Sequence, residues 1–286
     1  MITYFQAAVL GLLQGVSELF PVSSLGHSVI LPRLLHWSLN QQDPFFLTFL
    51  VATHTATALV LLGFFWQDWV RIVRGMGYSL KARDIQAGGS AARLGWLLVV
   101  GTIPAGLLGL LFQDPLRALF ASATITALFL LLNGVVLWVA ELLRRKVPEV
   151  SQVGIPDERI ARISWGKAVG IGTAQSIALI PGFSRSGAAM AGGLLSGLSH
   201  EDAARFSFLL ATPIIGAAAL LKLPSLLDPS MATLRGPAVV GAVCSGVAAY
   251  LAVRFLLRFF ETNRLTPFAL YCVLAGATAS LYLLQH

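Results

Sequence analysis

Charged residues are scarce in this sequence. Only 12% of its 286 residues are Asp, Glu, Lys or Arg, whereas 56% are hydrophobic, and soluble domains usually carry about a quarter charged residues. A soluble chain this apolar would aggregate, which excludes an ordinary soluble enzyme or binding domain. The composition favours a single membrane-embedded helical domain over residues 1–286.

Cysteines and nucleotide-binding motifs are also scarce. Cys244 and Cys272 both lie in apolar stretches. This position predicts packed thiols rather than a disulfide or a pair of metal ligands. No Walker-type loop or dinucleotide fingerprint occurs. Four histidines are scattered without the spacing of a zinc site, namely His36, His54, His200 and His286.

Basic residues outnumber acidic ones, 20 to 13. They cluster in short segments between apolar stretches, so we expect no nucleic-acid partner. The segments 67–93 and 144–164 are both rich in Lys and Arg and are predicted to be cytoplasmic, which places both termini outside. Residues 1–20 lack a basic start and a cleavage pattern, so we expect this segment to be retained.

Six apolar stretches have the length of a transmembrane helix, about 20 residues. They cover residues 46–66, 93–112, 119–143, 206–223, 238–259 and 267–284. Two further apolar regions, 2–36 and 165–199, are interrupted by Pro, Gly and polar residues. The predicted topology holds only if each is a re-entrant helix pair. Non-helical backbone at membrane depth must be buried in protein or line a wet cavity, so both interruptions are candidate site walls.

The two interrupted regions share an internal repeat. Gly11, Gln14, Ser23 and Gly26 recur as Gly172, Gln175, Ser184 and Gly187, each shifted by 161 residues. Three spans follow each region, so the halves 1–143 and 164–286 are predicted to form an inverted repeat. The predicted fold is therefore an all-α polytopic membrane protein with six transmembrane helices and two re-entrant pairs.

The first interruption concentrates polar side chains. An acidic residue at the centre of a membrane helix costs about 2.5 to 3.5 kcal/mol, so Glu18 is predicted to be functional unless it is solvated near an interface. Gln14 and Glu18 share one helix face, and Ser24 and His27 share another. We expect Ser23 or Ser24 to cap the helix that follows.

The second interruption places Arg185 between Ser184 and Ser186, before Gly187. A guanidinium fork and a helix start both suit phosphate oxygens. Phosphoryl transfer requires such charge stabilisation, so the two interruptions predict phosphoryl chemistry. The competing interpretation is a structural ion pair between Arg185 and Glu18, and the two roles do not exclude each other. Anion transport that uses the same arginine also stays open.

Four motifs then identify a resemblance. They are Gln14-x-x-x-Glu18 with Pro-Val-Ser-Ser-x-Gly-His27, Gly101-Thr-Ile-Pro-Ala105, Pro181-Gly-Phe-Ser-Arg-Ser-Gly187, and Ala204-Arg-Phe-Ser-Phe-Leu-Leu210. With these motifs the chain resembles the undecaprenyl-diphosphate phosphatase family, known for bacitracin resistance. The resemblance implies hydrolysis of undecaprenyl diphosphate at an outward-facing site of the bacterial inner membrane, which recycles the lipid carrier for peptidoglycan synthesis.

The resemblance also implies residue roles. The catalytic set is Glu18, Ser24, His27 and Arg185, and the substrate-binding set is Gln14, Ser23, Ser184, Ser186 and Gly187. Ser24 is the expected nucleophile with His27 as base, or His27 attacks directly. A divalent cation, Mg²⁺ or Ca²⁺, follows from the resemblance alone, with Glu18 as its one expected ligand. Homo-oligomerisation stays open.

Three departures from the family pattern keep alternatives open. Gln14 fills a position that can be Glu or Gln in the family. Ala189 stands where the family usually has Thr, and Leu50 stands where an acidic residue often follows Phe. One alternative is a lipid-phosphate transporter or flippase, since inverted repeats with broken helices are a transporter device. The other is a catalytically degenerate homologue.

Overall fold

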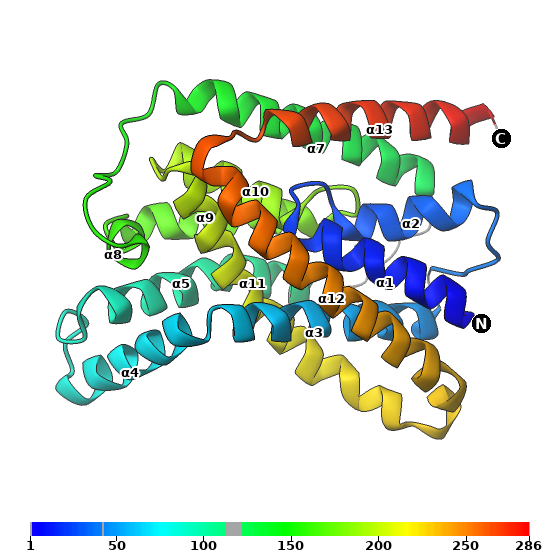
Figure 1. Cartoon of the computed structure of the whole chain (residues 1–286), viewed down its shortest axis with the longest axis horizontal. Coiled ribbons are helices and arrows are strands. Elements are labelled where there is room, and N and C mark those ends of the chain that lie inside the picture. The colour runs from blue at the N-terminus through cyan, green and yellow to red at the C-terminus, as the bar shows by residue number, and fades with distance from the viewer. Residues whose placement is uncertain (1, 42, 113–121, 286) are drawn as a thin grey trace.

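The computed structural model describes residues 2–41, 43–112 and 122–285, and their secondary structure is entirely helical (Figure 1). The α-helices are α1 Tyr4–Leu19, α2 Ser24–Leu34, α3 Pro44–Phe64, α4 Trp66–Ala82, α5 Gly89–Leu111, α7 Ala123–Arg144, α8 Pro156–Ala161, α9 Trp165–Ser176, α10 Arg185–Leu195, α11 His200–Lys222, α12 Ala232–Thr262 and α13 Thr266–Gln285. Short 3-10 helices are η1 Ile177–Leu179, η2 Leu223–Leu227 and η3 Pro229–Met231.

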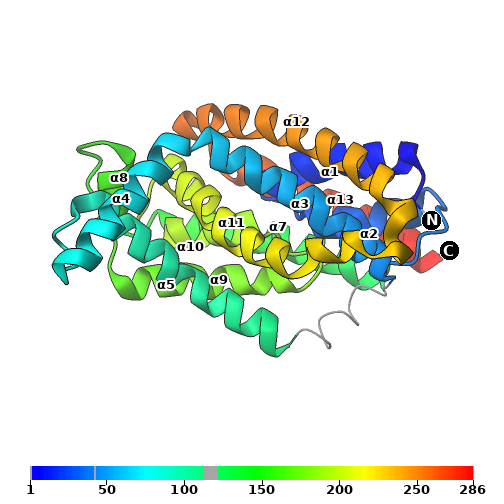
Figure 2. The same cartoon turned by 90° about the horizontal axis from the view of Figure 1, so that it is seen from below.

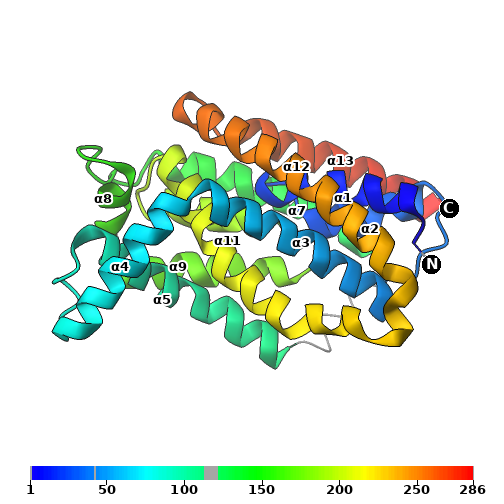
Figure 3. The same cartoon turned by 60° about the horizontal axis from the view of Figure 1, so that its bottom comes forward.

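The six predicted spans are confirmed as helices long and apolar enough to cross a membrane. They are α3, α5, α7, α11, α12 and α13, and they lie lengthwise along the molecule (Figures 1 and 3). Their outward faces carry large exposed apolar side chains, such as Leu110, Val243 and Leu274, which suit hydrocarbon rather than water. The start of the span predicted at 119–143 lies outside the described residues.

The two basic loops lie at one end of the molecule and both termini at the other (Figures 1 and 2), as the predicted topology requires. The loop 67–93 contains a helix that the sequence analysis did not predict, α4. This helix buries Ile72 and Ser79 and exposes Arg74 and Lys81. The mean hydropathy of α4 is too low for a transmembrane span. The sequence analysis therefore predicted a charged loop for these residues and missed the helix.

The two interrupted regions form helical hairpins, α1 with α2 and α9 with α10. α1 packs against α12, and α9 packs against α5. At Gly11 an added Cβ would lie 2.3 Å from the Gly241 carbonyl oxygen, and at Gly172 it would lie 2.1 Å from that of Gly101. Only glycine permits these backbones to approach so closely.

The repeated serines also have matching places in the two hairpins. Ser23 caps α2 by accepting a hydrogen bond from the Gly26 N–H, and Ser184 caps α10 by accepting one from the Gly187 N–H. The repeat in the sequence therefore corresponds to repeated structural roles. The inverted relation of the halves and the re-entrant insertion of the hairpins stay predictions.

The centre of the domain is formed where α10 and α11 pack together. Met190 and Leu194 from α10 and Phe206, Phe208 and Leu210 from α11 have no exposed surface. Close packing of large apolar side chains holds a helix in one position. The core therefore fixes the start of α10, where Arg185 lies.

Candidate active site

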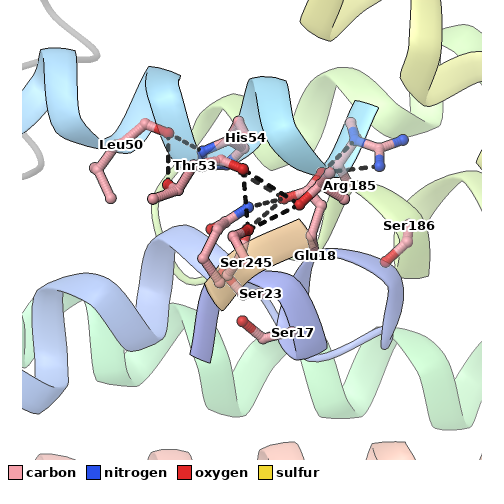
Figure 4. A network of polar contacts seen from close by, with 12 residues as sticks. Ser17, Glu18, Ser23, Leu50, Thr53, His54, Arg185, Ser186 and Ser245 are labelled. Atoms are coloured by element: carbon pink, nitrogen blue, oxygen red, sulfur yellow. Dashed lines mark hydrogen bonds and ion pairs between the residues drawn. The ribbon is translucent and has the colours of Figure 1, made fainter. Parts of the chain in front are cut away.

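Glu18, in the last turn of α1, is the residue at which the two hairpins meet (Figure 4). Its Oε1 atom accepts hydrogen bonds from Arg185 Nη2 at 2.9 Å and Nε at 3.2 Å. Its Oε2 atom accepts one from the Ser24 hydroxyl at 2.6 Å. Only 5% of Glu18 is exposed, so the guanidinium supplies the opposite charge that a buried carboxylate needs. The predicted ion pair is therefore present.

The backbone turn after α1 directs Ser24 toward this carboxylate. Ser23 has a φ of 68°, a conformation that costs a non-glycine residue about 1 to 3 kcal/mol. Its hydroxyl caps α2 at 3.1 Å from the Gly26 nitrogen, which confirms that one of the two serines is the cap. The strained turn places the first residue of α2, Ser24, against Glu18.

The second hairpin presents Arg185 in the same way. Ser184 caps α10, and its hydroxyl lies 3.0 Å from the Ser186 hydroxyl. Ser186 also donates to the Phe20 carbonyl at 3.0 Å, which ties the two hairpin turns together. Of the residues predicted to bind phosphate here, Ser184 and Arg185 line a cavity, whereas Ser186 and Gly187 lie behind it.

His54 of α3 is a site residue that the sequence analysis missed. Its Nε2 atom lies 3.2 Å from Glu18 Oε2, and its Nδ1 atom lies 2.7 Å from the Leu50 carbonyl oxygen (Figure 4). The sequence analysis had grouped His54 with the scattered histidines. Its position in the middle of an apolar span was the available signal, because an ionisable residue within a membrane segment is a functional candidate by default.

His27 lies elsewhere in the structure. Its Nδ1 atom contacts the Ser23 carbonyl oxygen at 2.7 Å, and its Nε2 atom contacts the Tyr271 hydroxyl at 2.8 Å. The two rings stack with centroids 5.8 Å apart. Both ring nitrogens are thus engaged away from Ser24 and Glu18. The structure does not bring His27 into the cluster, and its catalytic role stays a prediction.

The two repeated glutamines lie close to the site. Gln14 donates to Glu18 Oε2 at 3.1 Å, and Gln175 donates to the Gly101 carbonyl at 3.0 Å. The Oε1 atom of each is buried and has no hydrogen-bond partner among the described residues. Gln175 lines the cavity beside Arg185, whereas Gln14 supports the Glu18 carboxylate from behind.

The cavity holds about 380 Å³ and has two kinds of wall. Its polar lining includes the Glu18, Ser24, His54, Gln175 and Arg185 side chains, together with Ser17, Ser184 and, at the end of α11, Lys222. Most of the remaining lining is aliphatic and comes from α2, α3, α5, η1 and α11. A polar cluster in a mainly aliphatic cavity suits an amphiphile with an anionic group.

The described lining supplies one acidic side chain toward Mg²⁺ or Ca²⁺. These cations take six or more oxygen ligands, of which waters and substrate phosphates can supply several, and Glu18 is the only acidic residue in the described lining. Both of its oxygens already accept hydrogen bonds, and Leu50 occupies the position where an acid was expected. Among residues 2–41, 43–112 and 122–285 no cluster of three His, Cys, Asp or Glu residues is present. The cation, and Glu18 as its ligand, stay predictions.

Comparison with known proteins agrees with the motifs. The family model described as "Bacitracin resistance protein BacA" matches residues 7–278. This chain belongs to the BacA family. An undecaprenyl-diphosphatase of Mycolicibacterium paratuberculosis is 48% identical to it over 99% of this chain and 98% of the relative. Undecaprenyl-diphosphatase 2 of Frankia alni is 44% identical over 96% of both chains.

Membership of the BacA family and the six apolar spans together identify a multi-pass inner-membrane protein. The predicted resemblance and the predicted helical architecture are confirmed. Two of the departures noted in the sequence can be placed relative to the cavity. Leu50 lines the cavity, whereas Ala189 is buried within α10 and does not line it.

Proposed function

We propose that this protein hydrolyses undecaprenyl diphosphate to undecaprenyl phosphate and inorganic phosphate. The reaction recycles the lipid carrier for peptidoglycan synthesis and confers bacitracin resistance. The observation that carries the proposal is the contact of Glu18 with both Arg185 and Ser24 in the polar lining of a mainly aliphatic cavity. The names of the relatives support the same substrate.

The cavity suits both parts of this lipid. The aliphatic lining takes the first isoprene units, and Arg185 at the start of α10 takes the phosphoryl oxygens together with the helix N-terminus. Lys222 lines the cavity at the last residue of α11, at the end of the molecule that carries both termini. That end is outside in the predicted topology, so the site is proposed to take its substrate from the outer leaflet.

The contact between Ser24 and Glu18 supports a nucleophilic role for the serine. Glu18 accepts the hydroxyl proton as Ser24 Oγ attacks the terminal phosphorus. Arg185 stabilises the charge on the transferred phosphoryl group. Undecaprenyl phosphate leaves, and water then hydrolyses the phosphoserine. No step is assigned to a divalent cation, because Glu18 is the only acidic residue in the described lining.

The rival function is transport of a lipid phosphate. Transport would use Arg185 and the helix ends, but it gives no reason for Ser24 to donate a 2.6 Å hydrogen bond to a buried carboxylate. A catalytically degenerate homologue is the other rival. Ala189 is buried and does not line the cavity. The absence of a threonine hydroxyl at this position therefore removes no polar group from the cavity lining.

The test is release of inorganic phosphate from undecaprenyl diphosphate by purified protein in detergent, with Mg²⁺, with Ca²⁺ and with a chelator. We expect wild type to release phosphate and Ser24→Ala to lose about 10²-fold or more in kcat. Ser28→Ala is the matched control, because Ser28 lies one turn further along α2 and its buried hydroxyl has no partner in the described structure. Folded wild type that releases no phosphate would favour transport instead.

A further inference from the structure

Asn133, in the middle of α7, contacts the turns of both hairpins although it belongs to neither hairpin. Its Nδ2 atom donates to the Pro21 carbonyl at 3.1 Å, and its Oδ1 atom accepts from the Ser184 backbone N–H at 3.0 Å. Pro21 lies between α1 and α2, and Ser184 directly precedes α10. Only 1% of Asn133 is exposed, so one buried side chain joins two turns that lie far apart in the chain.

The partners of the Asn133 amide fix its orientation. A backbone N–H only donates and a carbonyl oxygen only accepts, so an amide with its nitrogen and oxygen exchanged would lose both hydrogen bonds. The Nδ2 atom also donates to Cys272 Sγ of α13 at 3.3 Å. A buried polar group that is hydrogen-bonded through both its donor and its acceptor atoms holds its partners rigidly. The two turns are therefore fixed relative to α7 and α13.

Close contacts of two glycines bring the same hairpins together. At Gly182, whose φ is 107°, an added Cβ would lie 2.4 Å from the Thr126 carbonyl oxygen of α7. At Gly26, near the start of α2, an added Cβ would lie 3.1 Å from the Gly182 Cα atom. The second turn thus packs against α7 and against the first hairpin, and Asn133 supplies a polar link at this junction.

The junction lies next to the residues that the proposed reaction uses. Ser24 lies three residues after Pro21, and Arg185 is the residue after Ser184. Asn133 does not line the cavity, so it can act on the reaction only through the two turns. A misplacement of about 1 Å in a reacting group can cost about 10²-fold in rate. The separation of the two turns is therefore expected to control the rate of the reaction.

We propose that Asn133 is a positioning residue for the hydrolysis, a role that rests on the proposed function. It holds the turn before Ser24 and the turn before Arg185 at one fixed separation, so that the serine hydroxyl and the guanidinium reach the same phosphoryl group. Binding of the diphosphate uses Arg185 and the aliphatic lining, whereas transfer of the phosphoryl group requires Arg185 and Ser24 together. Loss of the Asn133 amide should therefore lower kcat more than it raises KM.

The first test measures kcat and KM for phosphate release by Asn133→Leu, because leucine has a similar size and its side chain forms no hydrogen bonds. We expect kcat to fall about tenfold or more and KM to change less than about threefold. Thr126→Val is the matched control, since Thr126 is buried on the same helix and its hydroxyl donates to the Ser122 carbonyl rather than to a hairpin turn. We expect this control to keep the wild-type kcat. A wild-type kcat in Asn133→Leu, an equal loss of kcat in both variants, or an effect on KM alone would overturn the proposal.

Asn133→Ala is assayed beside Asn133→Leu, because the smaller side chain leaves room for water at the two backbone groups and offers a second route to folded protein. The same loss of kcat is expected. If neither variant can be purified in folded form while Thr126→Val can, the role of Asn133 is in folding and the proposal is overturned.

A binding measurement separates positioning from damage to the cavity. Calorimetric titration with a methylene-bridged, non-hydrolysable isoprenoid diphosphate gives the affinity without turnover. We expect Asn133→Leu to bind this lipid within about threefold of wild type, because each turn keeps its own contacts with the ligand. A loss of affinity as large as the loss of kcat would overturn the positioning role. Wild type that binds the analogue but releases no phosphate from undecaprenyl diphosphate would instead overturn the proposed function.

Discussion

Two ionic clusters of the molecule differ in their surroundings, because one of them lines the cavity and the other does not. The cluster around Glu18 has one carboxylate, contacted by Arg185 and His54, and it faces the 380 Å³ cavity. The second cluster, at the end with the basic loops, pairs Asp68 and Asp157 with Arg71 and Arg205. None of its four residues lines that cavity.

In the second cluster, each carboxylate is paired with both arginines. Arg205 donates to Asp68 at 2.7 Å and to Asp157 at 3.1 Å, and Arg71 contacts the same two carboxylates. The Arg205 guanidinium also lies 5.2 Å from the Phe65 ring centroid. Two positive charges thus balance two negative ones, and the cluster joins α4, α8 and α11. The same residue types are therefore structural when their charges pair internally and become candidates for catalysis when they border a cavity.

The largest effect is expected at Arg185. Arg185→Ala should reduce phosphate release at least 10³-fold, because charge on the phosphoryl group would lose its fixed cation. It should also lower the stability of the protein by about 3 to 5 kcal/mol, since Glu18 would be left buried without its guanidinium. Arg185→Lys should recover stability more than activity, because an ammonium keeps the charge without the planar fork. Phosphate release and thermal unfolding in detergent, measured on the same samples, separate the two effects. Normal turnover in Arg185→Ala would contradict the assignment of the site.

A different result is expected at Arg205. Arg205→Ala leaves Asp68 and Asp157 with Arg71 as their remaining partner in this cluster, so the thermal unfolding temperature should fall. The kcat of the folded fraction should stay within about threefold of wild type, because the cluster does not border the cavity. Size-exclusion purification before the assay supplies the folded fraction. A loss of tenfold or more in its kcat would show that the two clusters are coupled.

The sequence predicted one of these clusters better than the other. Glu18, Ser24 and Arg185 lie in short motifs whose polar residues interrupt apolar runs, so each could be found locally. The six spans were found for the same reason, because apolar runs of the required length have few alternative structures. The pairing of Asp68 with Arg205 depends instead on how α4 packs near α11, and no local pattern encodes that contact.

His54 and His27 show where local reasoning ends. His27 lies in the same motif as Ser24, yet its ring contacts Tyr271 of α13, which is 244 residues away in the chain. His54 lies in an apolar span without any motif, yet α3 brings it to Glu18. Which histidine reaches a buried carboxylate is decided by helix packing, and residue spacing along one helix does not contain that information.

The smallest effect is expected at Asp68, where burial raises the pKa of the carboxyl group and Asp157 acts in the same direction, against Arg205 and Arg71. A raised pKa means that folded Asp68 binds its proton at a pH where the unfolded chain has released it. Its contribution to stability is therefore greatest at low pH and is lost as pH rises through the folded pKa. Asp68→Asn should flatten this part of the curve of unfolding temperature against pH and leave kcat unchanged. If the curve of Asp68→Asn kept the wild-type slope, the pH dependence of the unfolding temperature would have to come from another group. The contrast between a structural and a catalytic cluster would then rest on the variants of Arg185 and Arg205 alone.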